Sequence, residues 1–181
     1  MKLSSMPLAV WVPFASGVAI GVPGLIALLT HHPILFASLG PTSVMIAQQP
    51  LLASTKPYNA IAGHMIGLGA GFFAVWALGI AGDPSVFVTH VVNGPRVCAG
   101  LLAIAVATGV EILLKAQHPP GAATTLLAAL GSFRIDWTDT WEVFVGVVAV
   151  TVTGELLQRL HPAPPPPAAR ASRARRPIQG S

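Results

Sequence analysis

The stretch "QHPPGAATT" at residues 117–125 decides the fold, because it interrupts a long apolar sequence with a helix break. Two prolines and a glycine end any helix that reaches them. Two threonines then place hydroxyl groups at the start of the next apolar segment. A break of this kind needs a structural reason, and the rest of the sequence supplies it.

The composition identifies an integral membrane protein. Only 9% of the 181 residues are charged and 53% are hydrophobic, whereas soluble domains carry about 25% charged residues. So few charges cannot cover a water-facing surface. The single cysteine, Cys98, excludes an internal disulfide and disfavours a thiolate metal cluster. The formal charge of +4 reflects arginines near the C-terminus, which indicates membrane orientation rather than binding to nucleic acid.

A membrane-spanning helix needs about 20 apolar residues. Four segments reach this length, and we expect them to span the bilayer: Leu8–Thr30, Ala60–Ala81, Val97–Lys115 and Trp141–Leu160. Two shorter apolar segments, 33–47 and 119–132, each carry a helix-breaking residue beside hydroxyl groups. Irregular backbone in a bilayer is tolerated only where protein or a water-filled cavity covers it. We therefore expect broken or half-length helices buried inside the bundle.

The two halves of the chain resemble each other. "LLTHHP" leads to "GPTSVMIA" (40–47), and "LLKAQHPPG" leads to "AATTLLAA" (122–129). Each half reads as a long span, a short broken element and a long span. The sequence therefore predicts an all-α polytopic membrane protein built from two weak three-element repeats in inverted orientation. Interrupted segments at corresponding places in two halves point to a transporter binding site.

The positive charges favour six membrane crossings over four. With six, Lys56 and Lys115 lie on the same side as the Arg-rich tail, which is expected to be cytoplasmic. Both termini then lie in the cytoplasm, and we expect the protein to reside in a bacterial inner membrane. Residues 1–160 form the predicted transmembrane domain, and residues 161–181 a disordered basic, proline-rich tail.

The two breaks suit an anion site. A helix N-terminus offers unpaired N–H groups and about half a positive charge. Pro41 fits a first helical position, and Gly40 and Gly121 allow close backbone approach. The hydroxyls add donors, unless they only bond back to their own helices. The predicted substrate-binding residues are Gly40, Pro41, Thr42, Ser43, His118, Pro119, Pro120, Gly121, Thr124 and Thr125.

Four further side chains are predicted to gate or couple transport: Asn59, His64, Glu111 and Lys115. Glu111 and Lys115 form an i, i+4 pair, and the same side of that helix carries Thr108 and His118. The alternative is an ion pair at the end of the span, with Lys115 reaching to the headgroups. An isolated histidine such as His64 is usually a structural hydrogen-bonding group.

Small residues form stripes on two of the long spans. Gly63, Gly67 and Gly71 recur every four residues, as do Ala99, Ala103 and Ala107 on the next long span. Such stripes let helices approach closely, so we expect these two helices to meet along them. The stripes also favour a homo-oligomer.

Two other functions stay open. One is a cation or metal transporter that uses His32, His64, His118 and Glu111, although the histidines are scattered along the chain. The other is a non-transporting membrane assembly protein. Motifs such as G-x-S-x-G and HExxH are missing from the sequence, so we expect neither an enzyme nor a resident metal or cofactor.

Three motifs together resemble the HPP family of integral membrane proteins. They are "FASLGPTSVM", "PYNAIAGH" and "HPPGAATTLL", in this order and each beside a hydrophobic segment. The family is named for the motif matched by His118, Pro119 and Pro120, and the likeness covers roughly residues 10–160. It implies four membrane helices and transport of a small inorganic anion. Members in cyanobacteria and chloroplasts are implicated in nitrite transport, so nitrite is the first substrate to expect.

Overall fold

The computed structural model describes residues 6–161, and all the regular structure in that range is helical. The elements are α1 (Leu8–Thr30), α2 (Leu39–Gln48), the 3₁₀ turn η2 (Ala53–Thr55), α3 (Pro57–Ala77), α4 (Val86–Thr89), α5 (Gly94–Leu113), α6 (Gly121–Ala129) and α7 (Trp137–Leu160). Four of them, α1, α3, α5 and α7, are long and apolar enough to cross a membrane. The prediction of four long and two short membrane helices is confirmed. The predicted tail lies outside the described residues, except for its first residue.

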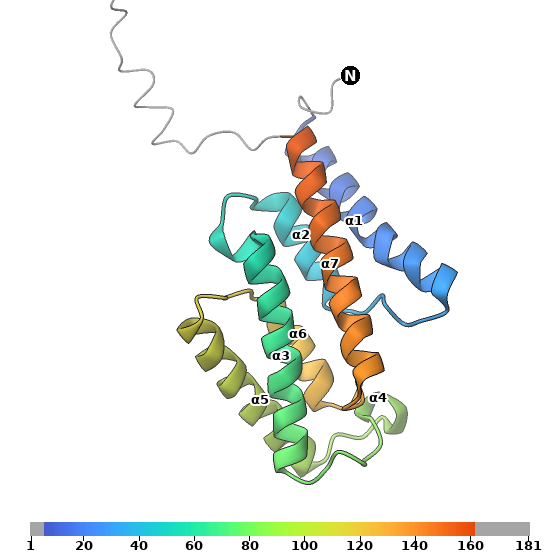
Figure 1. The fold of residues 1–181 in the computed structure, drawn as a ribbon, viewed down its shortest axis with the longest axis vertical. Helices are drawn as coiled ribbons and strands as arrows, with labels where there is room; N and C mark the ends of the chain where they lie inside the picture. Colours follow the sequence, from blue (N-terminus) through green and yellow to red (C-terminus); the bar gives the residue numbers. More distant parts are fainter. Residues whose placement is uncertain (1–5, 162–181) are drawn as a thin grey trace, which may run out of the picture.

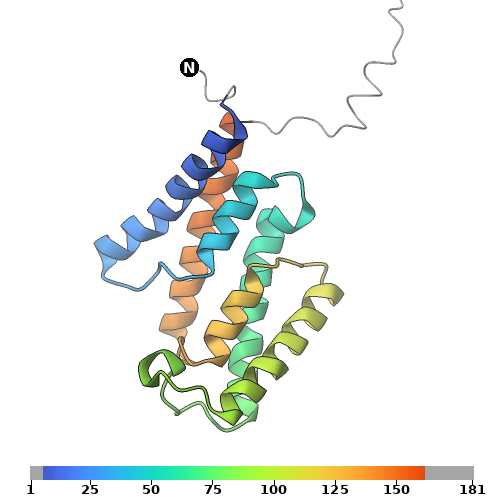
Figure 2. The same cartoon turned by 180° about the vertical axis from the view of Figure 1, so that it is seen from behind.

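The long helices α3 and α7 form the centre of the molecule. α3 contacts α5, α6 and α7, while α7 contacts α1, α2 and α3. Figure 1 shows α1 beside α7 and α5 beside α3. In Figure 2, the short helices α2 and α6 extend in opposite directions from the middle of the molecule, with their N-terminal ends toward each other. The two breaks in the sequence therefore meet inside the bundle.

Three long helices begin earlier than hydrophobicity predicts, because capping residues fix their first turns. α5 starts at Gly94 instead of Val97, and the Asn93 side chain before it accepts a 2.9 Å hydrogen bond from the Arg96 N–H. α3 starts at Pro57 instead of Ala60, since proline lacks only an N–H that the first turn leaves unpaired. The Asp136 carboxylate accepts a 2.8 Å hydrogen bond from the backbone N–H three residues further on. This cap starts α7 at Trp137 instead of Trp141.

α5 ends at Leu113, two residues before the predicted end of the span. Lys115 adopts a left-handed φ of 53°. Its N–H donates to the Ile112 carbonyl at 3.2 Å, and the Ala116 N–H donates to the Glu111 carbonyl at 2.8 Å. These two bonds form a Schellman motif, which stops the helix and turns the chain toward the centre of the bundle.

One end of the bundle, called here the terminal end, holds the start of α1 and the end of α7. The His161 Nε2 lies 3.0 Å from the Met6 carbonyl oxygen. One turn earlier on α7, the Gln158 amide donates to the Ile46 carbonyl at 2.7 Å. Because Ile46 lies in the last turn of α2, that short helix also finishes at the terminal end.

The opposite end of the bundle holds the end of α1 and the start of α7. The His32 Nδ1, just after α1, lies 2.7 Å from Glu142 Oε1, near the start of α7. The Arg96 guanidinium, in the first turn of α5, donates to the Ala129 carbonyl at 3.0 Å. Only residues 130–136 separate the end of α6 from the start of α7, so α6 ends, and α5 begins, at this opposite end.

Each short helix belongs to a passage between the two ends. After α1, the chain returns from the opposite end to the terminal end through an extended segment and then α2. α3 follows α2 and therefore starts at the terminal end. The Tyr58 hydroxyl at its start donates to the Leu114 carbonyl at 3.0 Å, so α5 also ends at the terminal end. From there, α6 carries the chain back to the opposite end. Each half thus runs between the ends of the bundle three times, as the six-crossing arrangement requires.

The helix contacts follow the same pattern in both halves, if α1, α2 and α3 are matched with α5, α6 and α7. Contacts of α1 with α2, α1 with α7 and α2 with α7 correspond to contacts of α5 with α6, α5 with α3 and α6 with α3. Gly146 and Gly154 on α7 repeat the spacing of Gly63 and Gly71 on α3. In both helices these glycines pack against the short element of the other half. This is the pattern expected of two inverted repeats.

The glycine stripe of α3 packs against α6 and the chain before it. A Cβ at Gly63 would lie 2.6 Å from His118 Cβ, and one at Gly67 would lie 2.5 Å from Thr125 Oγ1. Gly71 contacts α6 one turn further along. The alanine stripe of α5 packs instead around the last turns of α3. The two helices meet as predicted, but the glycine stripe does not take part, because it faces α6 instead of α5. Both stripes are buried within one chain, so neither offers a surface to a second copy.

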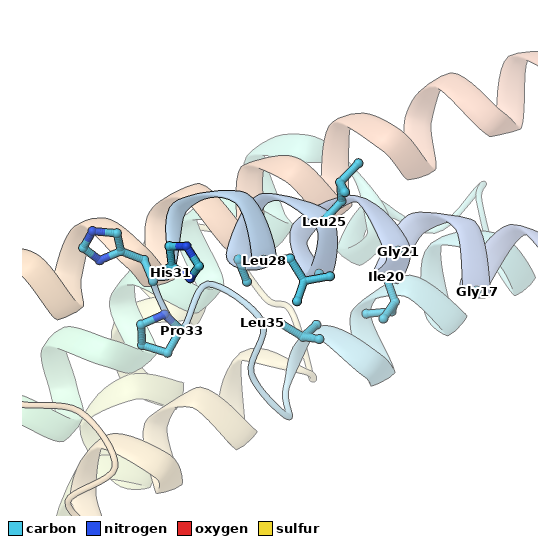
Figure 3. A pocket seen from close by; sticks show the side chains of 11 residues that line it. Gly17, Ile20, Gly21, Leu25, Leu28, His31, Pro33 and Leu35 are labelled. Carbon is cyan, nitrogen blue, oxygen red and sulfur yellow. The ribbon is translucent and has the colours of Figure 1, made fainter.

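An outer groove of about 890 Å³ lies between α1 and the chain that leads to α2 (Figure 3). Ile20, Leu25, Leu28 and Leu35 line it, with histidines at one end only. None of the predicted substrate-binding residues lines this groove. Its apolar walls suit contact with lipid, whereas buried polar side chains gather at the centre of the bundle.

Candidate functional site

Five polar side chains meet where the two half-helices begin. They come from both halves of the chain, and each has 0% of its surface exposed: Ser38, Thr42, His64, His118 and Thr124. We call this group the central cluster. Polar groups buried in a membrane bundle are costly unless they are hydrogen-bonded. The arrangement of the cluster meets this requirement.

Thr124 joins the two half-helices directly. Its Oγ1 lies 2.6 Å from the Ser38 hydroxyl, at the start of α2. The same Oγ1 lies 2.6 Å from His64 Nδ1 on α3. One hydroxyl on α6 therefore connects α2, α6 and the central helix α3.

Thr42 occupies the corresponding position on α2 and contacts both imidazoles. Its Oγ1 lies 2.8 Å from His64 Nε2 and 3.2 Å from His118 Nε2. It also lies 3.1 Å from the Ser38 carbonyl oxygen. The two imidazole rings are 5.0 Å apart between their centroids. His118 Nδ1 donates in turn to the Ser54 carbonyl at 2.6 Å.

Residues of the motif "PYNAIAGH" position His118 in the cluster. The Asn59 amide donates to the Lys115 carbonyl at 3.1 Å and to the Gln117 carbonyl at 3.2 Å. These bonds hold the chain just before the HPP motif. Gly63 leaves the space that the His118 side chain fills. Asn59 therefore holds this loop in position and is not a member of the central cluster.

The backbone donors at the start of the half-helices are already engaged. The N–H groups of residues 121–123 donate to the carbonyls of residues 118–120 at 2.7 to 3.1 Å. At α2, the Leu39 and Gly40 N–H groups donate to the carbonyls three residues earlier at 3.1 and 3.3 Å. These 3₁₀-type bonds leave side-chain hydroxyls and imidazoles as the groups that face the cluster.

Two of the four predicted hydroxyls bond back to their own helices. Ser43 donates to the Gly40 carbonyl at 2.8 Å, and Thr125 donates to the Gly121 carbonyl at 3.1 Å. Both are buried, but neither hydrogen-bonds to the central cluster. In each hydroxyl pair, one member therefore hydrogen-bonds to other side chains of the cluster, and the other bonds only to its own backbone.

Glu111 and Lys115 do not form the expected ion pair. The left-handed turn at Lys115 ends the helix, so the helical face does not continue to His118. Lys115 is exposed, and the only ion pairs within 4.0 Å in residues 6–161 join other residues. The Glu111 carboxylate is half-buried and lies beside the backbone N–H of His118.

The cluster contains no charged partner. None of its hydrogen bonds in the described part of the chain involves an Asp, Glu, Lys or Arg side chain. The four side chains considered for a cation do not come together, because His32 hydrogen-bonds to Glu142 at the opposite end of the bundle. Within residues 6–161, no three or more His, Cys, Asp or Glu side chains are grouped so as to hold a metal ion.

Ser38 and the Ser54 carbonyl were not predicted from the sequence as parts of the site. Ser38 lies four residues before Thr42, on the same side of the chain where α2 begins, and this spacing was the available signal. The Ser54 carbonyl belongs to a connecting turn, and nothing in its residue type marks it as a partner of His118. The pairing of His32 with Glu142 was also missed, because it joins residues far apart in the chain.

Arg96 is a second buried group that the sequence did not reveal. It is 2% exposed, and its guanidinium donates to the carbonyls of Ala129 and Asp83 at 3.0 and 2.7 Å. Its Nε has no hydrogen-bond partner among residues 6–161. The cation thus binds the C-terminal end of α6, where the helix dipole carries partial negative charge.

These features define a polytopic, all-helical membrane protein in which two half-helices meet at a buried polar junction. The chain belongs to the family described as HPP, transmembrane region, whose model matches residues 2–167. The resemblance carried by the three sequence motifs is thereby confirmed. A search of curated proteins and a search of solved structures each found no match.

Proposed function

We propose that the protein transports a small inorganic anion across the membrane, with nitrite as the first candidate, and that the central cluster is the binding site. One observation carries this proposal. Three hydroxyls and two imidazoles, all fully buried, meet at the N-terminal ends of two half-helices inside a membrane bundle. A bundle that served only as a scaffold would be expected to fill this place with apolar side chains.

The chemistry of the cluster suits a small anion. Hydroxyl and imidazole N–H groups are donors, and the N-terminal ends of α2 and α6 add partial positive charge. His118 supplies full positive charge when it is protonated. Since no acidic side chain within residues 6–161 is hydrogen-bonded to the cluster, an anion bound there contacts no like charge from this part of the chain. A cation would lack the carboxylate oxygens or thiolates that hold it in most sites.

The cluster is closed to both sides in this structure, because all five side chains are completely buried. Transport therefore requires the two halves to move relative to each other and open the junction to one side at a time. Inverted repeats commonly support such alternating access around a fixed central site. We propose the same use of the three-element halves here.

The proposal is tested by reconstituting the full chain in liposomes and measuring uptake of nitrite, nitrate, formate and chloride. We expect nitrite uptake well above that of protein-free liposomes, which sets the background from diffusion of nitrous acid. Uptake equal to that background for all four anions would rule the proposal out.

The two alternatives have less support. The histidines and Glu111 named for a cation are spread between the cluster and the opposite end of the bundle. A metal-dependent rise in melting temperature that is lost in His118→Ala would favour that alternative. The small-residue stripes named for an assembly protein are buried inside the chain, so an assembly or homo-oligomer would have to use another face. We propose a transporter rather than an enzyme.

A further inference from the structure

We propose that the central cluster binds a proton together with the anion, with the proton on His118 and the Thr42 hydroxyl as the switch between two protonation states. This inference rests on the proposed transport function and adds a second substrate to the same site. It follows from the direction in which each hydrogen bond of the cluster must point.

The neutral cluster has one consistent chain of donors. The Ser54 carbonyl can only accept, so His118 Nδ1 carries a hydrogen and Nε2 is an acceptor. The Thr42 hydroxyl, 3.2 Å away, then donates to His118 Nε2. The Thr42 oxygen is in turn free to accept from His64 Nε2 at 2.8 Å.

The remaining two bonds continue in the same direction. With its hydrogen on Nε2, His64 accepts at Nδ1 from the Thr124 hydroxyl at 2.6 Å. The Thr124 oxygen accepts from the Ser38 hydroxyl, also at 2.6 Å. Every polar side-chain atom of the cluster is then hydrogen-bonded, so the empty and neutral site is stable without water or ions.

A second, fully bonded state differs by one proton. If a proton from solution forms an N–H bond at His118 Nε2, that group becomes a donor to the Thr42 oxygen. The Thr42 oxygen then accepts from both imidazoles, and its own hydrogen rotates to the Ser38 carbonyl at 3.1 Å. No other hydrogen bond changes direction. The Ser38 carbonyl thus lets the cluster accept a proton without leaving a buried group unpaired.

Within residues 6–161, no carboxylate forms a hydrogen bond or an ion pair with either imidazole of the cluster, so the charge of this second state is not paired there. The short helices α2 and α6 contain no titratable residue. Around His118, α3 brings Tyr58 and the neutral His64, and the turn after α5 brings the exposed Lys115. Lys56, before α3, is also exposed, and the half-buried Glu111 carboxylate lies beside the backbone N–H of His118.

The partner for the imidazolium must therefore be the transported anion. A bound anion stabilises the proton on His118, and the proton stabilises the anion by the same factor. The pair carries no net charge, which lowers the cost of passing it through the low-dielectric bundle. Transport is then electroneutral and brings one proton with each anion.

Voltage dependence tests this inference separately from transport itself. Liposomes with the full chain are given a membrane potential by a potassium gradient and valinomycin, and nitrite uptake and internal pH are followed together. An uncoupled anion would change its accumulation ratio by roughly 50-fold per 100 mV. We expect a ratio independent of voltage, with acidification that exceeds the signal of protein-free liposomes.

Transport that depends on voltage without added acidification overturns proton coupling and leaves anion transport intact. Uptake at the protein-free level overturns both proposals. Two variants test the switch: Thr42→Ser keeps the hydroxyl and should keep the coupling, whereas His118→Gln removes the proton acceptor and should make any remaining uptake voltage-dependent. Electroneutral transport by His118→Gln would place the proton elsewhere and overturn the assignment.

Discussion

At the scale of single residues, the site depends on backbone positions that lack a side chain. Gly63 and Gly121 face each other, and a Cβ at Gly121 would lie 2.8 Å from the Gly63 carbonyl oxygen. This approach brings the HPP loop close enough to α3 for His118 and His64 to share the Thr42 hydroxyl. The glycines thus set the geometry of the cluster.

Gly63→Ala is predicted to destabilise the protein by about 1–3 kcal/mol, because the new methyl group overlaps His118 and the Ala116 carbonyl. Gly69→Ala in the same helix is the matched control, since a Cβ there meets nothing within 4 Å. That change should be neutral or stabilising by about 0.5–1 kcal/mol. Thermal unfolding in detergent measures both, and equal melting temperatures for the two variants would contradict the close packing.

At the scale of elements, much of the architecture could be predicted from the sequence. The long spans follow from apolar length, and the half-helices from Gly and Pro beside hydroxyls. The boundaries were shifted by caps such as Asp136 and by the turn at Lys115, which hydropathy does not detect. The partner of the glycine stripe was predicted wrongly, because equal spacing on two helices does not show which helices face each other.

The candidate site was predicted only in part. Thr42, His118 and Thr124 were expected to face a common site, and the structure brings them together with His64. The role of Ser38 was not predicted, because it depends on how two half-helices far apart in the sequence meet. Hydrogen bonds between distant segments follow from the packed fold, which local sequence patterns do not specify.

A substitution of Arg96 tests how much this side chain stabilises the protein through the C-terminal end of α6. Arg96→Gln removes the buried cation from the Ala129 and Asp83 carbonyls and should destabilise the protein by about 1.5–3 kcal/mol. Arg134→Gln is the control, because the Arg134 side chain is 76% exposed and pairs with carboxylates at the surface. That change should cost at most about 1 kcal/mol. Chemical unfolding of both variants in detergent would show the difference, and equal losses would contradict a special role for Arg96.

At the scale of the whole molecule, the two halves of the chain pack against each other around the central cluster. The exposed Lys56 and Lys115 lie at the terminal end, whereas Asp83 and Asp136 lie at the opposite end. The positive-inside rule then places the terminal end in the cytoplasm, which we propose as the orientation. The side of the membrane on which each connection between helices lies can be tested directly.

Single cysteines at Thr30 and Lys56, introduced into a Cys98→Ala background, report whether the chain between α1 and α3 crosses the membrane. Both positions are exposed, one just before the turn after α1 and the other just before α3. We expect a membrane-impermeant maleimide to label Thr30→Cys in intact cells and Lys56→Cys only after permeabilisation. Labelling of both from the same side would show that α2 is re-entrant and would contradict the six-crossing arrangement.

The central claim is that an anion passes through the cluster, and the most direct test compares nitrite uptake by three forms of the protein in liposomes. Thr124→Val removes the hydroxyl that joins Ser38 and His64, while Thr153→Val removes a hydroxyl of α7 outside the cluster. We predict that uptake by Thr153→Val equals that of the wild type. Uptake by Thr124→Val should fall at least about tenfold, because the substitution removes two buried hydrogen bonds. Wild-type uptake by a folded Thr124→Val protein would contradict the account.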